Sequence, residues 1–142
     1  MSFTGNHIAN SFKVEVLRGL HNFDTSGDTF KLALYDSTAT LTATTTAYTT
    51  TVEVTGTGYS AGGSALTNVT PTSGGTSGIT DFDDLTFSTV TLTARGALIY
   101  NSTNGNRAVA VLDFSSNQTR TAADLIIQFP TADRSNAIIR IN

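Results

Sequence analysis

Residues Ala94–Phe114, with the sequence ARGALIYNSTNGNRAVAVLDF, decide the fold. Two runs of strand-forming residues, Ala97–Tyr100 and Arg107–Phe114, flank a polar segment that contains Asn104-Gly105. Because Asn-Gly favours the backbone conformations of tight hairpin turns, the stretch predicts a β-hairpin. The run AVAVLDF is apolar on both faces, which is typical of a strand inside a packed sheet or under another subunit. We therefore expect a central strand with four buried side chains, those of Val109, Val111, Leu112 and Phe114.

The rest of the chain adds further strands. Apolar or alternating runs predict them at Thr29–Tyr35, Thr49–Thr55, Ala65–Val69, Ile79–Phe87, Thr89–Arg95, Leu125–Phe129 and Ala137–Ile141. In Thr49–Thr55 we expect Val52 and Val54 to face inward. The segments Ser37–Thr46, Gly56–Gly63 and Pro71–Gly78 are typical of loops. About eight strands predict an all-β fold, a single-domain β-sandwich or flattened barrel over residues 1–142.

The N-terminal region predicts one short helix preceded by an arm. We expect the helix over residues 10–19, capped by Asn10 or Ser11 and ended by Gly19. A helix this short is marginal alone, so it must dock, and its apolar residues for docking are Phe12, Val16 and Leu17. Residues 1–10 lack a pattern for burial in their own domain, and we expect this arm to pack on a neighbouring subunit.

Composition excludes several classes of function. The 142 residues carry a net charge of −3 and no Cys, so neither a basic stripe for nucleic acid nor thiol chemistry is expected. No secretory signal and no membrane-spanning run is expected either. The chain has 27 threonines, whose branched Cβ suits strands and whose hydroxyl suits an uncharged exposed face.

The residues that carry catalysis are sparse, and we expect no enzyme, no catalytic residue and no cofactor. There are two histidines and no Gly-x-Ser-x-Gly elbow. His21 follows the helix, where it is expected to face the helix dipole or bond a free carbonyl. His7 is expected on the exposed arm or at an interface.

Charged residues offer one candidate metal site and one candidate ion pair. Asp81 and Asp83 would share a strand face beside Asp84, so they predict either a Ca²⁺ site or, the reading we favour, a solvated strand edge with no metal. Arg95 and Arg107 flank the hairpin and are expected to pair with Asp113 or Asp84, or to reach a neighbouring subunit.

Several runs resemble a family of small proteins encoded by tailed bacteriophages. They are SFTGNHIANSFKVEVLRGLHNF (2–23), FKLALYDSTATL (30–41), TAYTT (46–50), GTGYSAGG (56–63), ARGALIYNST (94–103) and AVAVLDF (108–114). The similarity spans Ser2 to about Phe129, and residues 131–142 depart from it. The resemblance implies a virion structural protein without catalytic activity.

Within the virion, the resemblance implies a capsid decoration or cement protein bound to the major capsid protein. A tail or fibre-attachment component that binds a tail protein is the alternative. Exposed strand edges with few charges predict a homo-oligomer, in a capsid setting a trimer joined by strand edges. A receptor- or glycan-binding module is a further alternative, in which Tyr48 and Tyr59 would offer a stacking surface.

Overall fold

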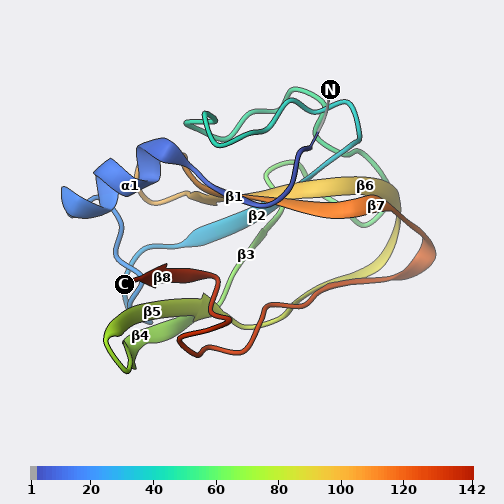
Figure 1. Ribbon diagram of the computed structural model, residues 1–142. Coiled ribbons are helices and arrows are strands. Elements are labelled where there is room, and N and C mark those ends of the chain that lie inside the picture. The colour runs from blue at the N-terminus through green and yellow to red at the C-terminus, as the bar shows by residue number, and fades with distance from the viewer. Residues whose placement is uncertain (1–2) are drawn as a thin grey trace.

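The predicted hairpin is the largest element of the structure. In the computed structural model, which describes residues 3–142, β6 (Leu85–Asn101) and β7 (Arg107–Ile127) pair antiparallel along most of their length (Figure 1). Gly105 and Asn106 in the connecting turn have positive φ values of 69° and 55°. The Asn-Gly signal thus marks a true turn, and the predicted hairpin is confirmed.

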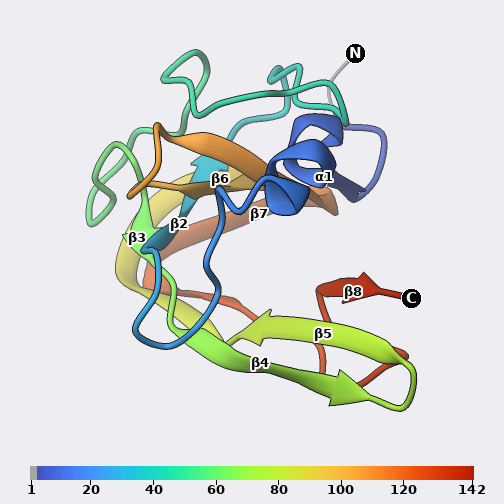
Figure 2. The ribbon, with the colours of Figure 1, turned by 90° about the vertical axis from the view of Figure 1, so that its left-hand side faces the viewer.

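The strands form two antiparallel sheets, which confirms the all-β, sandwich-like fold with one short helix. The larger sheet has the order β1-β7-β6-β2-β3, and the smaller has the order β4-β5-β8. Their remaining strands are β1 (His7–Ile8), β2 (Phe30–Tyr35), β3 (Ser64–Ala65), β4 (Asn68–Gly74), β5 (Ser77–Phe82) and β8 (Ile139–Ile141). Figure 2 shows the two sheets as separate layers, connected on one side by the curved β6 and β7.

The hairpin curves because its pairing is interrupted. The register shifts between Phe87 and Val90, between Val90 and Leu92, and between Ala94 and Gly96. Thr89, Ser115 and Ala122 have positive φ, a conformation that non-glycine residues adopt at bulges and tight bends. These irregularities let one hairpin contribute to both layers of the core.

The core lies mainly between the layers and against the hairpin. Val109, Val111 and Leu112 are buried as predicted, on an interior strand of the larger sheet. Phe114 is only half-buried, so its predicted full burial is wrong. It lies one residue beyond the part of β7 that the N-terminal arm covers, on the open side of the sandwich.

Two predictions of local structure are wrong for identifiable reasons. Thr49–Thr55 forms only an isolated bridge through Glu53, because Tyr48, Tyr59 and Gly62 hold its carboxylate. Val54 is buried as expected, but Val52 is exposed with φ of 55°. Pro71–Gly78 is not a loop but most of the β4–β5 hairpin, where Pro71 lies on an edge strand at a register shift that tolerates its missing N–H.

The helix α1 (Asn10–Leu17) forms where predicted and docks through Phe12 and Val16 as expected, but not through Leu17. Gly19 follows it with φ of 73°, as expected for a helix end. Ala9 occupies the N-cap position, so the predicted capping by Asn10 or Ser11 is wrong. Phe12 is buried, whereas Leu17 is 86% exposed, and the second fully buried helical side chain is that of Glu15.

The N-terminal arm packs on its own domain over residues 3–9, which corrects the expectation that it lacks burial there; residues 1 and 2 lie outside the described residues. His7 and Ile8 pair with Val111 and Ala110 of β7, and the Phe3 side chain is buried. Phe3 lies against Gly96, where a Cβ would fall 2.5 Å from the ring. The missing side chain at residue 96 therefore creates the site that receives the arm.

Candidate docking groove

A groove of about 820 Å³ opens on the side of the sandwich away from β3. In Figure 2, β8 lies below the larger sheet, on the same side of the molecule as α1. The groove lies within the roughly 300–1,000 Å³ typical of ligand clefts. Its walls are Asn6–Ile8 from the arm, Ala110–Phe114, Gln118, Arg120 and Leu125–Ile127 from β7, and Gln128–Pro130, Asn136–Ile138 and Arg140 from the C-terminal segment.

The groove borders the edge of β7 rather than one of its faces. Side chains alternate between the faces of a strand, yet successive residues over Ala110–Phe114 and Leu125–Ile127 all line the groove. Strand β1 pairs only with Ala110 and Val111 of this edge. Beyond Asp113, no second strand among residues 3–142 pairs with the outer edge of β7.

The groove surface is partly apolar. Phe114, Phe129 and Ile138 are half-buried beside it, and Ile126 is 53% exposed. Large apolar side chains gathered around a concavity are typical of a contact site. The groove therefore combines an apolar lining with an unpaired strand edge.

The charged side chains of the groove leave an excess of positive charge. Arg120 donates to the backbone oxygens of Asp124 and Thr119, both at 2.9 Å, and Arg140 donates to those of Ser135 and Arg134. Neither guanidinium forms an ion pair with a carboxylate among residues 3–142, although the Asn136 and Ser135 hydrogen bonds and the nearby charge of Arg140 lower the pKa of Asp133. An anionic group at the groove would gain from both.

Asp113 is the one carboxylate of the groove, and it is already neutralised. It lies 3.1 Å from the guanidinium of Arg95, which confirms the predicted pairing of Arg95. Burial disfavours its charged form, but the hydrogen bond from the Ser115 N–H and the charge of Arg95 outweigh burial and hold the pKa of Asp113 below its ordinary value. Its other oxygen accepts the N–H of Gly5 at 3.0 Å.

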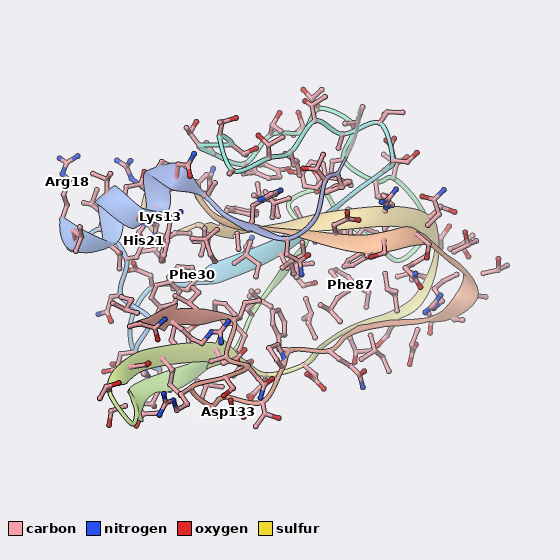
Figure 3. The ribbon with its side chains drawn as sticks, in the orientation of Figure 1. Lys13, Arg18, His21, Phe30, Phe87 and Asp133 are labelled. Carbon is pink, nitrogen blue, oxygen red and sulfur yellow. The ribbon has the colours of Figure 1, made fainter. Side chains whose placement is uncertain are left out.

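The two histidines take different positions. His7 is half-buried in the arm, lines the groove, and lies 3.1 Å from the Thr4 hydroxyl. His21 is buried, with Nε2 2.8 Å from Glu15 Oε2, so its predicted bond to a free carbonyl is wrong. The nearby carbonyl of Leu20 accepts the side chain of Asn104 instead. Figure 3 shows His21 beneath α1 and near Phe30.

The amide of Asn101 fixes the tautomer of His21. Asn101 Oδ1 accepts the N–H groups of Thr103 and Asn104, both at 3.1 Å, so its Nδ2 faces His21 Nδ1 at 3.1 Å. An amide nitrogen only donates, and His21 Nδ1 must therefore accept. In this tautomer the Nε2 proton is directed at Glu15. Asn101 at the end of β6 and Arg107 at the start of β7 connect this buried pair to the larger sheet.

Arg107 forms an ion pair with Glu15 rather than with one of the aspartates expected to be its partner. Its Nη1 lies 3.3 Å from Glu15 Oε1, which corrects the expected pairing with Asp113 or Asp84. No local pattern predicts this contact, because the two residues lie 92 positions apart in the sequence. Glu15 therefore links the helix to both His21 and the start of β7.

The expected sharing of a strand face by Asp81 and Asp83 is wrong. Strand β5 ends at Phe82, so Asp83 and Asp84 lie in the turn before β6, and Asp81 is buried. Burial raises the pKa of Asp81, whose carboxylate accepts the N–H of Phe82 at 2.9 Å. Asp84 accepts the N–H of Phe129 at 2.7 Å. Within the described part of the chain, no three acidic or histidine side chains are placed to hold a metal ion.

A cluster of all four tyrosines around Glu53 was not predicted from the sequence. Tyr48 and Tyr59 donate their hydroxyls to the Glu53 carboxylate at 2.6 and 2.7 Å. Burial, and then the hydrogen bond to Glu53, raise the pKa of both hydroxyls well above the ordinary value. Tyr35 donates to the oxygen of Thr49, and Tyr100 donates to the oxygen of Gly62.

This tyrosine cluster fastens the long segment between β2 and β3. The ring of Tyr48 stacks on Tyr100 at 4.7 Å, and the ring of Tyr59 lies 5.7 Å from Phe87. Both rings therefore contact other side chains of this chain. They do not form the open stacking surface expected for a glycan site.

No helix within residues 3–142 is long and apolar enough to cross a membrane. Comparisons of the chain with protein-family models, with curated proteins and with solved structures find no match.

Proposed function

We propose that this chain is a structural protein of a tailed-bacteriophage virion, where it decorates the capsid and binds the major capsid protein. The observation that carries the proposal is the resemblance of six runs of the sequence, spread from Ser2 to Phe114, to phage virion proteins. The open-sided groove adds physical support, because a decoration protein needs a surface on which the shell can dock.

The architecture suits an accessory of a shell. Strands β6 and β7 form one long curved hairpin that extends through both layers. Mechanical force on one layer is therefore transmitted to the other through continuous backbone. The long Thr-rich segment is fastened by the tyrosine cluster rather than left without contacts. These features favour a rigid fold, which suits a protein that is present in many copies on one particle.

Self-association is part of the proposal. The outer edges of β4 and β8 end the smaller sheet, and Ile141 on β8 is 59% exposed. Unprotected edges favour strand pairing between subunits, and a closed symmetric ring removes them. We infer a homo-oligomer in the virion, with a trimer as its simplest form.

The test is the composition and density of purified particles. Washed virions are expected to contain this chain in hundreds of copies, and a density map is expected to place it evenly over the head. A few copies at one vertex would instead identify the tail or fibre-attachment alternative. Absence from washed virions would contradict both assignments.

A further inference from the structure

We propose that the groove receives one extended segment of the neighbouring virion protein, which adds as a β-strand to the free edge of β7. This inference rests on the proposed function for the origin of the segment. The groove itself, with its unpaired edge, apolar lining and two arginines, determines the chemistry that the segment must have.

The unpaired edge determines the conformation of the occupant. An edge strand presents a row of backbone N–H and C=O groups, and an extended peptide satisfies them while a helix does not. Strand β1 already does this over Ala110 and Val111, where residues 7 and 8 pair with β7. An added segment would continue the same kind of pairing past Asp113.

The lining determines which side chains the occupant carries. Successive side chains of an added strand point in opposite directions. Those that face the groove would cover Phe114, Ile126 and Ile138, which are the partly exposed apolar groups there. The occupant therefore needs apolar residues at alternate positions.

Charge favours an acidic segment and disfavours a second copy of this edge. Arg120 and Arg140 line the groove without a carboxylate partner in the described part of the chain. Two copies brought together through this groove would bring four such guanidiniums close to one another. The irregular backbone at Ser115 and Ala122 limits any added strand, whether of this chain or of another protein, to the stretches of edge between and beside these residues.

The test compares two apolar residues that differ in position but hardly in exposure. Ile126→Glu places a negative charge in the groove, where it disrupts the apolar lining and repels an acidic segment. Val14→Glu is the control, because Val14 is 59% exposed on α1 and does not line the groove. Both variants should keep the melting temperature of the parent, because both side chains are largely exposed. We expect Ile126→Glu to lower the occupancy of this chain on virions at least about tenfold, and Val14→Glu to leave it close to the parent value.

A double variant tests whether the occupant is acidic. Arg120→Glu combined with Arg140→Glu reverses the charge of the groove and leaves its apolar side chains unchanged. We expect a comparable loss of occupancy, and a parent-like occupancy would contradict the acidic segment.

A photo-crosslinking side chain at residue 126, in purified particles, identifies the occupant. We expect its adducts to map to one extended, acidic and apolar segment of another virion protein. Adducts to a second copy of this chain, or parent-like occupancy of Ile126→Glu, would overturn the inference while leaving the virion assignment intact. Absence of the parent chain from particles would instead overturn the proposed function and this inference together.

Discussion

The ring of Phe3 lies where a side chain at Gly96 would have to stand. A Cβ at residue 96 would fall 2.5 Å from Phe3 Cε1 and 2.5 Å from the backbone oxygen of Leu112. The N-terminal arm and the middle of β6 therefore depend on each other, although neither shows this in its local sequence.

Gly96→Ala is expected to lower the free energy of unfolding by about 1–3 kcal/mol through overpacking. Phe3→Ala should also destabilise, because a buried ring is lost. Denaturant unfolding of both variants and of the double variant forms a cycle. The two effects should be clearly less than additive, because both changes disrupt one contact. Additive effects would show that the arm does not depend on Gly96.

Leu98→Ala and Leu17→Ala separate the core from the outer face of α1. Leu98 is fully buried in β6, and its truncation should cost about 2–5 kcal/mol. Leu17 is the matched control, since it is 86% exposed and its truncation should change stability by less than about 0.5 kcal/mol. Equal losses in thermal or denaturant unfolding would mean that α1 docks through Leu17 after all.

The tyrosine cluster predicts a loss of stability in alkali. Because the pKa values of Tyr48 and Tyr59 are raised in the folded state, their contribution is fully present below the unfolded value of about 10. That contribution is lost as the pH rises above this value. Tyrosinate absorbance of the native protein should therefore appear only together with unfolding.

Glu53→Gln is the matched variant for this cluster. The amide nitrogen of the glutamine cannot accept a hydrogen bond from a hydroxyl, so one of the two tyrosines loses its acceptor. We expect the free energy of unfolding near neutral pH to fall by about 1–3 kcal/mol. Parent-like stability together with free titration of the tyrosines near pH 10 would contradict the cluster.

Asp113 predicts the opposite dependence in acid. Its pKa is lowered by folding, so its contribution is present above the unfolded value of about 3.9 and is lost as the pH falls through the lower folded value. Asp113→Asn should be less stable than the parent near neutral pH, and the difference should shrink in acid. Asp83→Asn, which changes an exposed carboxylate in the β5–β6 turn, is the control and should leave the pH profile unchanged.

The tautomer of His21 is open to direct observation. Nitrogen-15 NMR of the imidazole should show the proton on Nε2 and an unprotonated Nδ1, because Asn101 Nδ2 donates to the latter. Asn101→Ala should release this constraint and lower stability by about 1–3 kcal/mol, since buried polar partners are left unsatisfied. A proton on Nδ1 in the parent would show that the Asn101 amide is oriented the other way.

Local signals predicted the hairpin and the helix, because both depend on residues close together in the sequence. Asn104-Gly105 marks the turn, and Gly19 marks the helix end. The position of the arm was not predictable in this way, because it depends on a glycine far along the chain. Strand β4 was missed because Pro71 and its neighbouring glycines are typical of loops, although an edge strand tolerates them.

The groove was also beyond local prediction. It exists because β6 and β7 bend from one layer to the other, and the bends lie at residues such as Thr89, Ser115 and Ala122. None of these is the glycine that would normally announce a positive φ. The partners of Glu15 and Glu53 were not predicted either, although His21, Tyr48 and Tyr59 lie only five or six residues away, because the irregular segments after α1 and β2 give no periodic pattern that would place these side chains together.

The pairing of the arm with β7 also constrains the order of events during synthesis. The side chain of Asn6 accepts the N–H of Asp113, a residue 107 positions later. The arm emerges from the ribosome before β7, yet its binding site is complete only when β7 has been made and has paired with β6. Such distant pairings are slow to close, so the nascent chain must carry an undocked Phe3 until β7 is available. A polar, Asn- and Thr-containing arm is well suited to remain soluble during that wait.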